Sequence, residues 1–234
     1  MRFVNRALWI GLFTAVIGLA NLNATTFSRI EEMSGWKSCG NCTKLYGATY
    51  SMQQHVSSPS RDGDSTKFSV GGSSSGGAAL WYRWMSSNST ATNFVYDLYY
   101  YMKTPGAAGA MEFSASQRSG YKWYRWDTQC LFTDIAVWRL WNNATGHWYR
   151  TSIPCKRPAP YTWTHLVWEG KKVNGKVLFV SLSVNGQKHY LNKTFDPKYM
   201  GSSDNSVKVH FQLNGNSQMT DYSAWGDQFK LTYW

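Results

Sequence analysis

Acidic residues are scarce in this chain of 234 residues, in which 13 Asp and Glu stand against 24 Lys and Arg. The formal net charge is +11, and only 16% of the residues are charged, whereas ordinary globular domains carry about 25%. Disorder is nevertheless excluded, because the 13 Trp, 15 Tyr and 11 Phe can bury a sizeable core. The length fits one large β domain or two small domains.

Long apolar runs are absent beyond the extreme N-terminus, which excludes a transmembrane helix in the mature chain. Arg2 and Arg6 precede a short apolar run at 7–20, where Gly18 and Ala20 place small residues before a cleavage site. This pattern predicts a signal peptide over residues 1–20, with Ala24 as a later cleavage position and an uncleaved anchor as the alternative. Because cleavage removes two arginines, we expect a secreted protein, extracellular or periplasmic, with a charge of +9.

Cysteine is limited to Cys39, Cys42, Cys130 and Cys155. Four cysteines allow three pairings, and in an oxidising compartment we favour Cys39–Cys42 and Cys130–Cys155. The alternatives for the C-x-x-C at 39–42 are a redox site or half of a zinc site. Both are disfavoured, because the sequence has no second C-x-x-C, no His-x-x-x-His and no βαβ pattern.

Helical periodicity is missing after residue 25, where short β-branched and aromatic runs are bounded by Gly, Asn, Ser and Pro. The expected strands cover residues 93–102, 110–117, 121–132, 135–141, 162–169, 177–184, 206–213 and the C-terminal end. Asn174-Gly175 and Asn185-Gly186 predict two type I′ hairpins. The glycine- and serine-rich stretch at 71–77 is interpreted as a loop rather than a domain linker. This pattern is typical of a sandwich, a jelly roll or a barrel.

The turn-rich segment at 103–109 predicts that strands 93–102 and 110–117 form an antiparallel hairpin. Every register that pairs the apolar residues of these strands places Asp97, Tyr99 and Tyr101 on the same face as Glu112. Two carboxylates would then share a face with two tyrosines, at a distance that depends on the register.

Three features occur in order in the last third of the chain: Trp163-x-His165-Leu166-x-Trp168, an alternating segment at 180–187 with an Asn-Gly turn, and a closing aromatic strand at 227–234. Together they resemble the concanavalin A-like lectin/glucanase superfamily, with its laminin-G-like branch nearest. The resemblance implies a jelly roll of two curved antiparallel sheets, which we expect to form a single domain over residues 25–234.

The whole mature chain also resembles a group of secreted bacterial proteins that have no assigned activity. The shared features are the early C-x-x-C, the strand at 111–113, and the segments 146–148, 152–155 and 231–234.

A further likeness concerns catalysis, because residues 95–98 and then Met111-Glu112-Phe113 resemble the paired strands of family-12-type endoglucanases. This likeness implies that Glu112 is a nucleophile. The chain departs from the pattern, because Ser-Ala-Ser follows Phe113 and the other glutamates (Glu31, Glu32 and Glu169) are poor candidates for the proton donor. The signatures of family-16-type glucanases and of alginate lyases with this fold are absent.

A glycan-binding module is the first hypothesis for function. Pyranose rings stack on aromatic side chains, and polar side chains fix their hydroxyl groups. The candidate platforms are Tyr99, Tyr101, Trp123, Trp126, Trp138 and Trp141, and the candidate polar contacts are Arg125, His210 and Gln212. Most of the tryptophans are expected in the core, and the alternative for His210 is a solvated edge residue.

A glycoside hydrolase is the second hypothesis, with Glu112 and Asp97 as its catalytic carboxyls. Retaining hydrolysis needs two carboxyls about 5–5.5 Å apart, and inversion needs roughly 6.5–9.5 Å. In the alternative interpretation both acids are polar groups without a catalytic role. A structural or adhesive envelope protein is the third hypothesis.

The positive charge favours a polysaccharide partner, and in particular an acidic one. Bases and aromatics also alternate at 121–126 as in single-stranded nucleic-acid binders, but secretion argues against nucleic acid and strand alternation explains the pattern equally well. For a structural calcium ion the nearest candidate is Asp62-Gly63-Asp64, which is more typical of a turn. We therefore expect a monomer without metal or cofactor.

Overall fold

The computed structural model describes residues 24–39, 48–72, 76–218 and 220–234. The signal peptide predicted at 1–20, the centre of the loop predicted at 71–77 and Cys42 lie outside these residues. Within the described part, no helix is long and apolar enough to cross a membrane.

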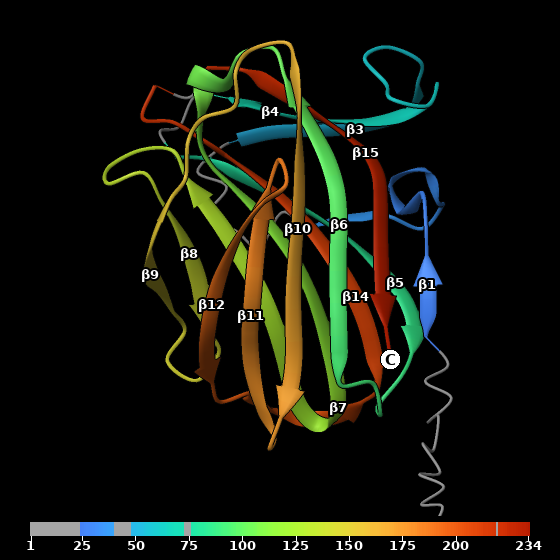
Figure 1. The fold of residues 1–234 in the computed structure, drawn as a ribbon. Helices are drawn as coiled ribbons and strands as arrows, with labels where there is room; N and C mark the ends of the chain where they lie inside the picture. Colours follow the sequence, from blue (N-terminus) through green and yellow to red (C-terminus); the bar gives the residue numbers. More distant parts are fainter. Residues whose placement is uncertain (1–23, 40–47, 73–75, 219) are drawn as a thin grey trace, which may run out of the picture.

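Two antiparallel sheets pack face to face, which confirms the predicted all-β jelly-roll sandwich (Figure 1). Sheet I contains, in spatial order, β12 (Gln187–Phe195), β11 (Lys176–Val184), β10 (Thr162–Val173), β6 (Asn93–Met102), β15 (Tyr222–Tyr233), β4 (Ser65–Gly72) and β3 (Ala48–Val56), with β1 (Thr25–Phe27) paired to β15. Sheet II contains β2 (Lys37–Cys39), β5 (Ala78–Ser87), β14 (Ser206–Gly215), β7 (Ala108–Leu131), β8 (Val137–Asn142) and β9 (His147–Pro154), with β13 (Lys198–Asp204) paired to β7. The short 3-10 segments are η1 (Ile30–Glu32) and η2 (Pro105–Ala107).

The long strand β7 doubles back on itself near Gly120, which has a positive φ of 60°. Phe132 N donates to Gly109 O over 2.9 Å, and the Thr128 hydroxyl donates to Phe113 O over 2.8 Å. The first arm of β7 therefore lies beside the second arm, and β6 lies in the opposite sheet. The predicted hairpin between 93–102 and 110–117 is wrong, because 110–117 lies between β14 and the second arm of β7.

The core lies between the sheets and is built from every second residue of each strand, as the pleat requires. Its members on the strands analysed above are Phe94, Tyr96, Leu98, Tyr100, Met102, Met111, Phe113, Ala115, Val207, Val209, Phe211 and Leu213, all almost fully buried. The predicted inward and outward faces of these strands are thus confirmed, although the predicted pairing between two of them is not.

Two tight turns join β10, β11 and β12 into a meander. Asn174 and Gly175 have φ values of 50° and 73°, and Asn185 and Gly186 have values of 49° and 82°. Positive φ at both central residues is the geometry of a type I′ turn, so both predicted hairpins are confirmed.

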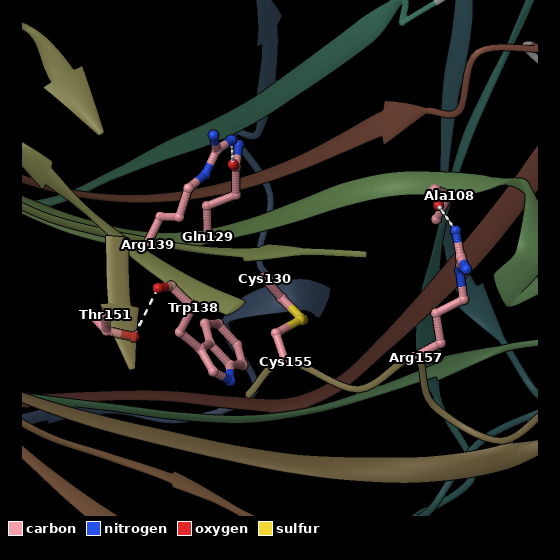
Figure 2. Close-up of a disulfide and its surroundings, with 8 residues drawn as sticks. All are labelled: Ala108, Gln129, Cys130, Trp138, Arg139, Thr151, Cys155 and Arg157. Carbon is pink, nitrogen blue, oxygen red and sulfur yellow. Dashed lines mark hydrogen bonds between the residues drawn. A yellow bond between two sulfur atoms is a disulfide. The ribbon is translucent and has the colours of Figure 1, made fainter. Parts of the chain in front are cut away.

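A disulfide joins Cys130 at the end of β7 to Cys155 just after β9, with a Cα–Cα distance of 5.5 Å (Figure 2). This confirms the second predicted pairing. Cys39 lies in β2, but its predicted partner Cys42 is outside the described residues, so that pairing stays a prediction.

Replacing both Cys130 and Cys155 with serine is expected to lower the free energy of unfolding by roughly 3 kcal/mol. The disulfide links two residues that are 25 positions apart in the sequence and so restricts the conformations of the unfolded chain. Its loss raises the conformational entropy of the unfolded state, which lowers the stability of the folded state. Urea unfolding of the double variant and of the oxidised wild type measures the loss. A double variant as stable as the oxidised wild type would contradict a stabilising bond.

The buried Glu31 ties η1 to a bulge in β15. Its carboxylate oxygens accept hydrogen bonds from Gln228 N at 2.6 Å and Phe229 N at 2.8 Å, where Gln228 has a φ of 54°. Burial raises the pKa of Glu31 to about 7, even though these backbone donors favour the charged form.

Replacing Glu31 with glutamine is expected to change how stability depends on pH. A carboxyl whose pKa is higher in the folded state takes up its proton on folding, so its contribution grows as pH falls from about 7 to 4.5. Between pH 7 and pH 4.5, the free energy of unfolding of the wild type should rise by on the order of 3 kcal/mol relative to that of the Glu31→Gln variant. The measurement is urea unfolding of both proteins at the two ends of the interval, and a constant difference would contradict the expectation.

Candidate functional site

A groove of about 750 Å³ crosses the face of sheet II that points away from sheet I. Neighbouring strands β5, β14, β7, β8 and β9 supply its lining, mostly through alternate residues that point to one face. The lining residues are Gly76, Ala78, Leu80, Tyr82, Trp84, Glu112, Ser114, Trp123, Arg125, Asp127, Trp141, Trp148, Lys208, His210, Gln212 and Asn214.

The structure brings six of the predicted site residues together in this groove. They are Glu112, Trp123, Arg125, Trp141, His210 and Gln212. Their common position follows from strand alternation on β7, β8 and β14, since each has a core residue as its immediate neighbour.

Trp126 and Trp138 do not line the groove, and their predicted role as ligand platforms is wrong. Trp126 is fully buried between the sheets and donates its indole N–H to Leu178 O at 3.1 Å. Trp138 is 2% exposed and packs near Phe113 in the same core. Trp126 follows the groove residue Arg125, and Trp138 precedes Arg139, whose side chain also lies on the groove side. Because successive side chains of a strand point to opposite faces, both tryptophans point into the core and away from the groove.

Tyr99 and Tyr101 lie on the outward face of sheet I, on the other side of the sandwich from the groove. The Tyr99 ring stacks on His165 with centroids 4.2 Å apart, and the Arg61 guanidinium lies 3.7 Å from the ring centre. Tyr101 is largely covered by Trp163 and Trp225. Their predicted place beside Glu112 is therefore wrong.

Asp97 lies on the same face of sheet I as Tyr99 and is already paired. Its carboxylate contacts His165 Nε2 at 2.7 Å and Lys230 Nζ at 3.0 Å. Because β6 and β7 belong to different sheets, Asp97 cannot act with Glu112 on one substrate, and the predicted catalytic pair is wrong.

Glu112 lies on the groove floor and receives two amide hydrogen bonds. Gln129 Nε2 and Gln212 Nε2 each lie 2.6 Å from its Oε1, and Arg139 donates in turn to the side-chain oxygen of Gln129 (Figure 2). Burial, followed by the charge of Asp127, raises the pKa of Glu112 to about 7. Near neutral pH this carboxyl is therefore divided between its acid and its carboxylate form.

Asp127 shares the groove with Glu112 and forms an ion pair with Arg125. Burial raises the pKa of Asp127, although Arg125 acts in the opposite direction. Glu112 and Asp127 come from the two adjacent arms of β7, so the carboxyl that shares the groove with Glu112 is Asp127 and not Asp97.

His210 lies in the middle of the groove floor, because β14 is flanked by β5 and β7. Burial, followed by the charges of Arg125 and Lys208, lowers its pKa to about 3. The imidazole is therefore neutral at ordinary pH. The alternative interpretation of His210 as a solvated edge residue is wrong.

Cations accompany the indole rings of the groove. Lys37 on β2 and Lys208 on β14 lie 5.0 and 4.5 Å from the centre of the Trp84 ring. These two strands flank β5, which carries Trp84. Arg125 lies 4.6 Å from the Trp123 ring and 5.2 Å from the Trp141 ring. Arg139 lies 5.3 Å from the Trp148 ring.

Sequence reasoning missed several groove residues, namely Tyr82, Trp84, Ser114, Asp127, Trp148, Lys208 and Asn214. The alternation of side chains along a strand could have identified two of them. Asp127 is two residues after Arg125, and Lys208 is two residues before His210, so each shares a face with a predicted residue. No comparable signal placed β5 beside β14.

Metal-binding geometry is not found in the described part of the chain, where no three His, Cys, Asp or Glu side chains gather. Asp62 and Asp64, the nearest candidates for calcium ligands, instead contact Arg29 at 3.8 Å and His55 at 2.7 Å.

No protein-family model and no curated protein sequence matches the chain. Solved structures with a similar fold include an endo-β-1,4-glucuronan lyase from the fungus Trichoderma reesei, with a TM-score of 0.55 at 11% identity over 88% of this chain and 94% of the other. The PL-14 alginate lyase from Aplysia kurodai gives 0.51 at 10% identity over 88% and 97%. The cellulose-induced protein Cip1 gives 0.51 at 11% identity over 88% and 96%. At these identities the likeness is one of fold.

Proposed function

We propose that the groove of sheet II binds an acidic polysaccharide. The observation that carries this proposal is the pairing of indole rings with cations along one groove, where Trp84, Trp123, Trp141 and Trp148 each have a lysine or arginine within 5.3 Å. A sugar ring stacked on an indole would bring its carboxylate to the neighbouring cation.

The remaining groove chemistry suits the same ligand. Gln212 and Asn214 supply amides for sugar hydroxyls, and the neutral His210 adds a hydrogen-bonding group without charge. Solved proteins of similar fold are described as acting on glucuronan and alginate, which are both polyuronates. The Cys130–Cys155 disulfide is typical of an oxidising compartment, such as the extracellular space.

Chromatography on immobilised polysaccharides tests this proposal. Alginate and β-1,4-glucuronan should retain the protein, retention should fall as salt rises, and cellulose should retain it weakly. Free passage through both acidic columns would contradict the proposal. Equal retention on cellulose would instead indicate a neutral glycan.

Cleavage of the bound chain is a second candidate function, and the presence of Glu112 and Asp127 in one groove favours it. A partly protonated carboxyl beside a second carboxyl that is paired with an arginine suits the roles of acid and of base or nucleophile in glycoside hydrolysis. Incubation with glucuronan or alginate should then release shorter chains, and Glu112→Gln should abolish release while binding persists. New reducing ends without an ultraviolet-absorbing unsaturated uronate would indicate hydrolysis, and their appearance together would indicate elimination.

A further inference from the structure

A second space of about 550 Å³ lies between the two sheets, at the edge where β12 of sheet I meets β9 of sheet II. Sheet I borders it through β6, β10, β11 and β12, and sheet II borders it through β8 and β9. The connection from β9 to β10 at 155–161 forms its remaining wall. The groove of sheet II shares none of these lining residues, so this space is separate from the proposed polysaccharide site.

The inner end of the space is apolar and buried. Trp138 and Ile153 of sheet II and Tyr100 of sheet I line it, and all three are almost fully covered. Thr164 on β10 is paired with Tyr100 across the strands and is also buried, so the only polar groups at this end are two hydroxyls. A ligand that reached this end would therefore contact mainly hydrocarbon and aromatic rings.

The outer end of the space is basic. Lys156 and Arg157 are exposed on the connection at 155–161, and His189 is half-buried on β12. Among the described residues that line the space, none is Asp or Glu, and the side chains of Lys156 and His189 form no hydrogen bond or ion pair with any described residue. An anionic group at this end would thus meet a lysine with no competing carboxylate.

The connection at 155–161 is anchored at both ends, which holds the space open. Cys155 is joined by the disulfide to Cys130 (Figure 2), and its backbone N donates to Ala136 O at 2.8 Å. At the other end, Tyr161 N donates to Met102 O at 2.9 Å. A wall fixed in this way needs little reordering when a ligand binds, which lowers the entropic cost of binding.

We infer that this space is a second binding site, for a small aromatic carboxylate whose ring enters between the sheets and whose carboxylate stays beside Lys156. The apolar inner end suits a ring, and packed sheets lie only about 10 Å apart, which favours a flat group over a bulky one. The volume is within the range of about 300–1,000 Å³ that is usual for small-molecule sites. The inference does not depend on what the groove of sheet II binds.

Equilibrium dialysis with 2-naphthoate tests the inference, and the uncharged 2-naphthamide is the comparison ligand. Val184→Trp would fill the space from β11, and Lys156→Glu reverses the charge at its outer end. The matched controls are Val173→Trp and Lys171→Glu on β10, because both residues are exposed and neither lines the space. If Val184→Trp does not fold, Lys156→Glu decides the test, since Lys156 is exposed and its substitution should not disturb folding.

Wild type should bind 2-naphthoate about fivefold more tightly than 2-naphthamide, the difference expected for one exposed ion pair. Lys156→Glu should weaken 2-naphthoate about tenfold and leave 2-naphthamide unchanged, because attraction is replaced by repulsion. Val184→Trp should weaken both ligands by about tenfold or more, and the two controls should match wild type.

Three results would overturn the inference: no binding of either ligand by wild type, undiminished binding by a folded Val184→Trp variant, or equal affinity for 2-naphthoate in wild type and Lys156→Glu. Each of these outcomes leaves the proposed polysaccharide site unaffected, because the two sites have no lining residue in common.

Discussion

Binding of an acidic polysaccharide is expected to strengthen about fivefold between pH 8 and pH 6, through protonation of Glu112. The pKa of this carboxyl is raised to about 7 by burial and by Asp127, so it is largely ionised at the higher pH and largely neutral at the lower. A nearby ligand carboxylate that raises this pKa by one further unit, which is about 1.4 kcal/mol, produces a change of that size. The sign is fixed, because the ionised Glu112 repels an anionic ligand.

Other groups around Glu112 allow this effect to be assigned. His210 has a pKa lowered to about 3 and stays neutral over the interval, and Gln129 and Gln212 do not titrate. Calorimetry on Glu112→Gln should show strong binding with little dependence on pH. Glu169→Gln is the matched control, because Glu169 pairs with Lys188 on sheet I and should leave the pH dependence unchanged. A Glu112→Gln variant with the wild-type pH profile would contradict this role of Glu112.

Replacing Gly170 with alanine is expected to destabilise the protein by about 3 kcal/mol. Gly170 lies in β10 directly beneath the buried Trp126, and a Cβ added there would come within 2.5 Å of the indole Nε1. Trp126 is held by the core on all sides and by its hydrogen bond to Leu178 O, so it cannot move aside cheaply. The change would therefore strain the sandwich between its two sheets.

Gly201→Ala is the control for this substitution. Gly201 lies in β13, and a Cβ added there meets nothing within 4 Å, so its unfolding free energy should stay within about 0.5 kcal/mol of wild type. Urea unfolding of the two variants measures the difference. Equal stabilities would mean that Trp126 is not fixed between the sheets and would reopen its role as a ligand platform.

The faces of the strands could be predicted from the sequence because a strand alternates with a period of two. The apolar Val207, Val209, Phe211 and Leu213 point inward, and Lys208, His210 and Gln212 line the groove, as their alternation requires. The Asn-Gly hairpins were predictable for a similar local reason, since few other dipeptides accept two positive φ values.

The partners of the strands could not be predicted in the same way. Alternation says which side chains share a face of one strand, but it does not say which strand lies alongside. The chain between β6 and β7 crosses from one sheet to the other, whereas the sequence at 103–109 is equally compatible with a hairpin. That single error placed Asp97, Tyr99 and Tyr101 beside Glu112, whereas they lie on the opposite side of the molecule.

The sequence could predict which side chains of a single strand share a face, but not which strands come together to form the site. Trp123, Arg125 and Glu112 were each named as candidates and line one groove, but Trp126 differs from Arg125 in parity and belongs to the core. The cations over Trp84 and Trp148 come from neighbouring strands, so only the assembled sheet brings them together.

Calorimetric titration of alginate into two variants tests the central claim most directly. Trp84→Ala combined with Trp148→Ala removes two rings from the groove of sheet II, and Tyr99→Ala removes a ring from the outward face of sheet I. We expect the first variant to lose most of its affinity and the second to bind as wild type does. Undiminished binding by the groove variant, with loss in Tyr99→Ala, would place the ligand on sheet I and contradict the account.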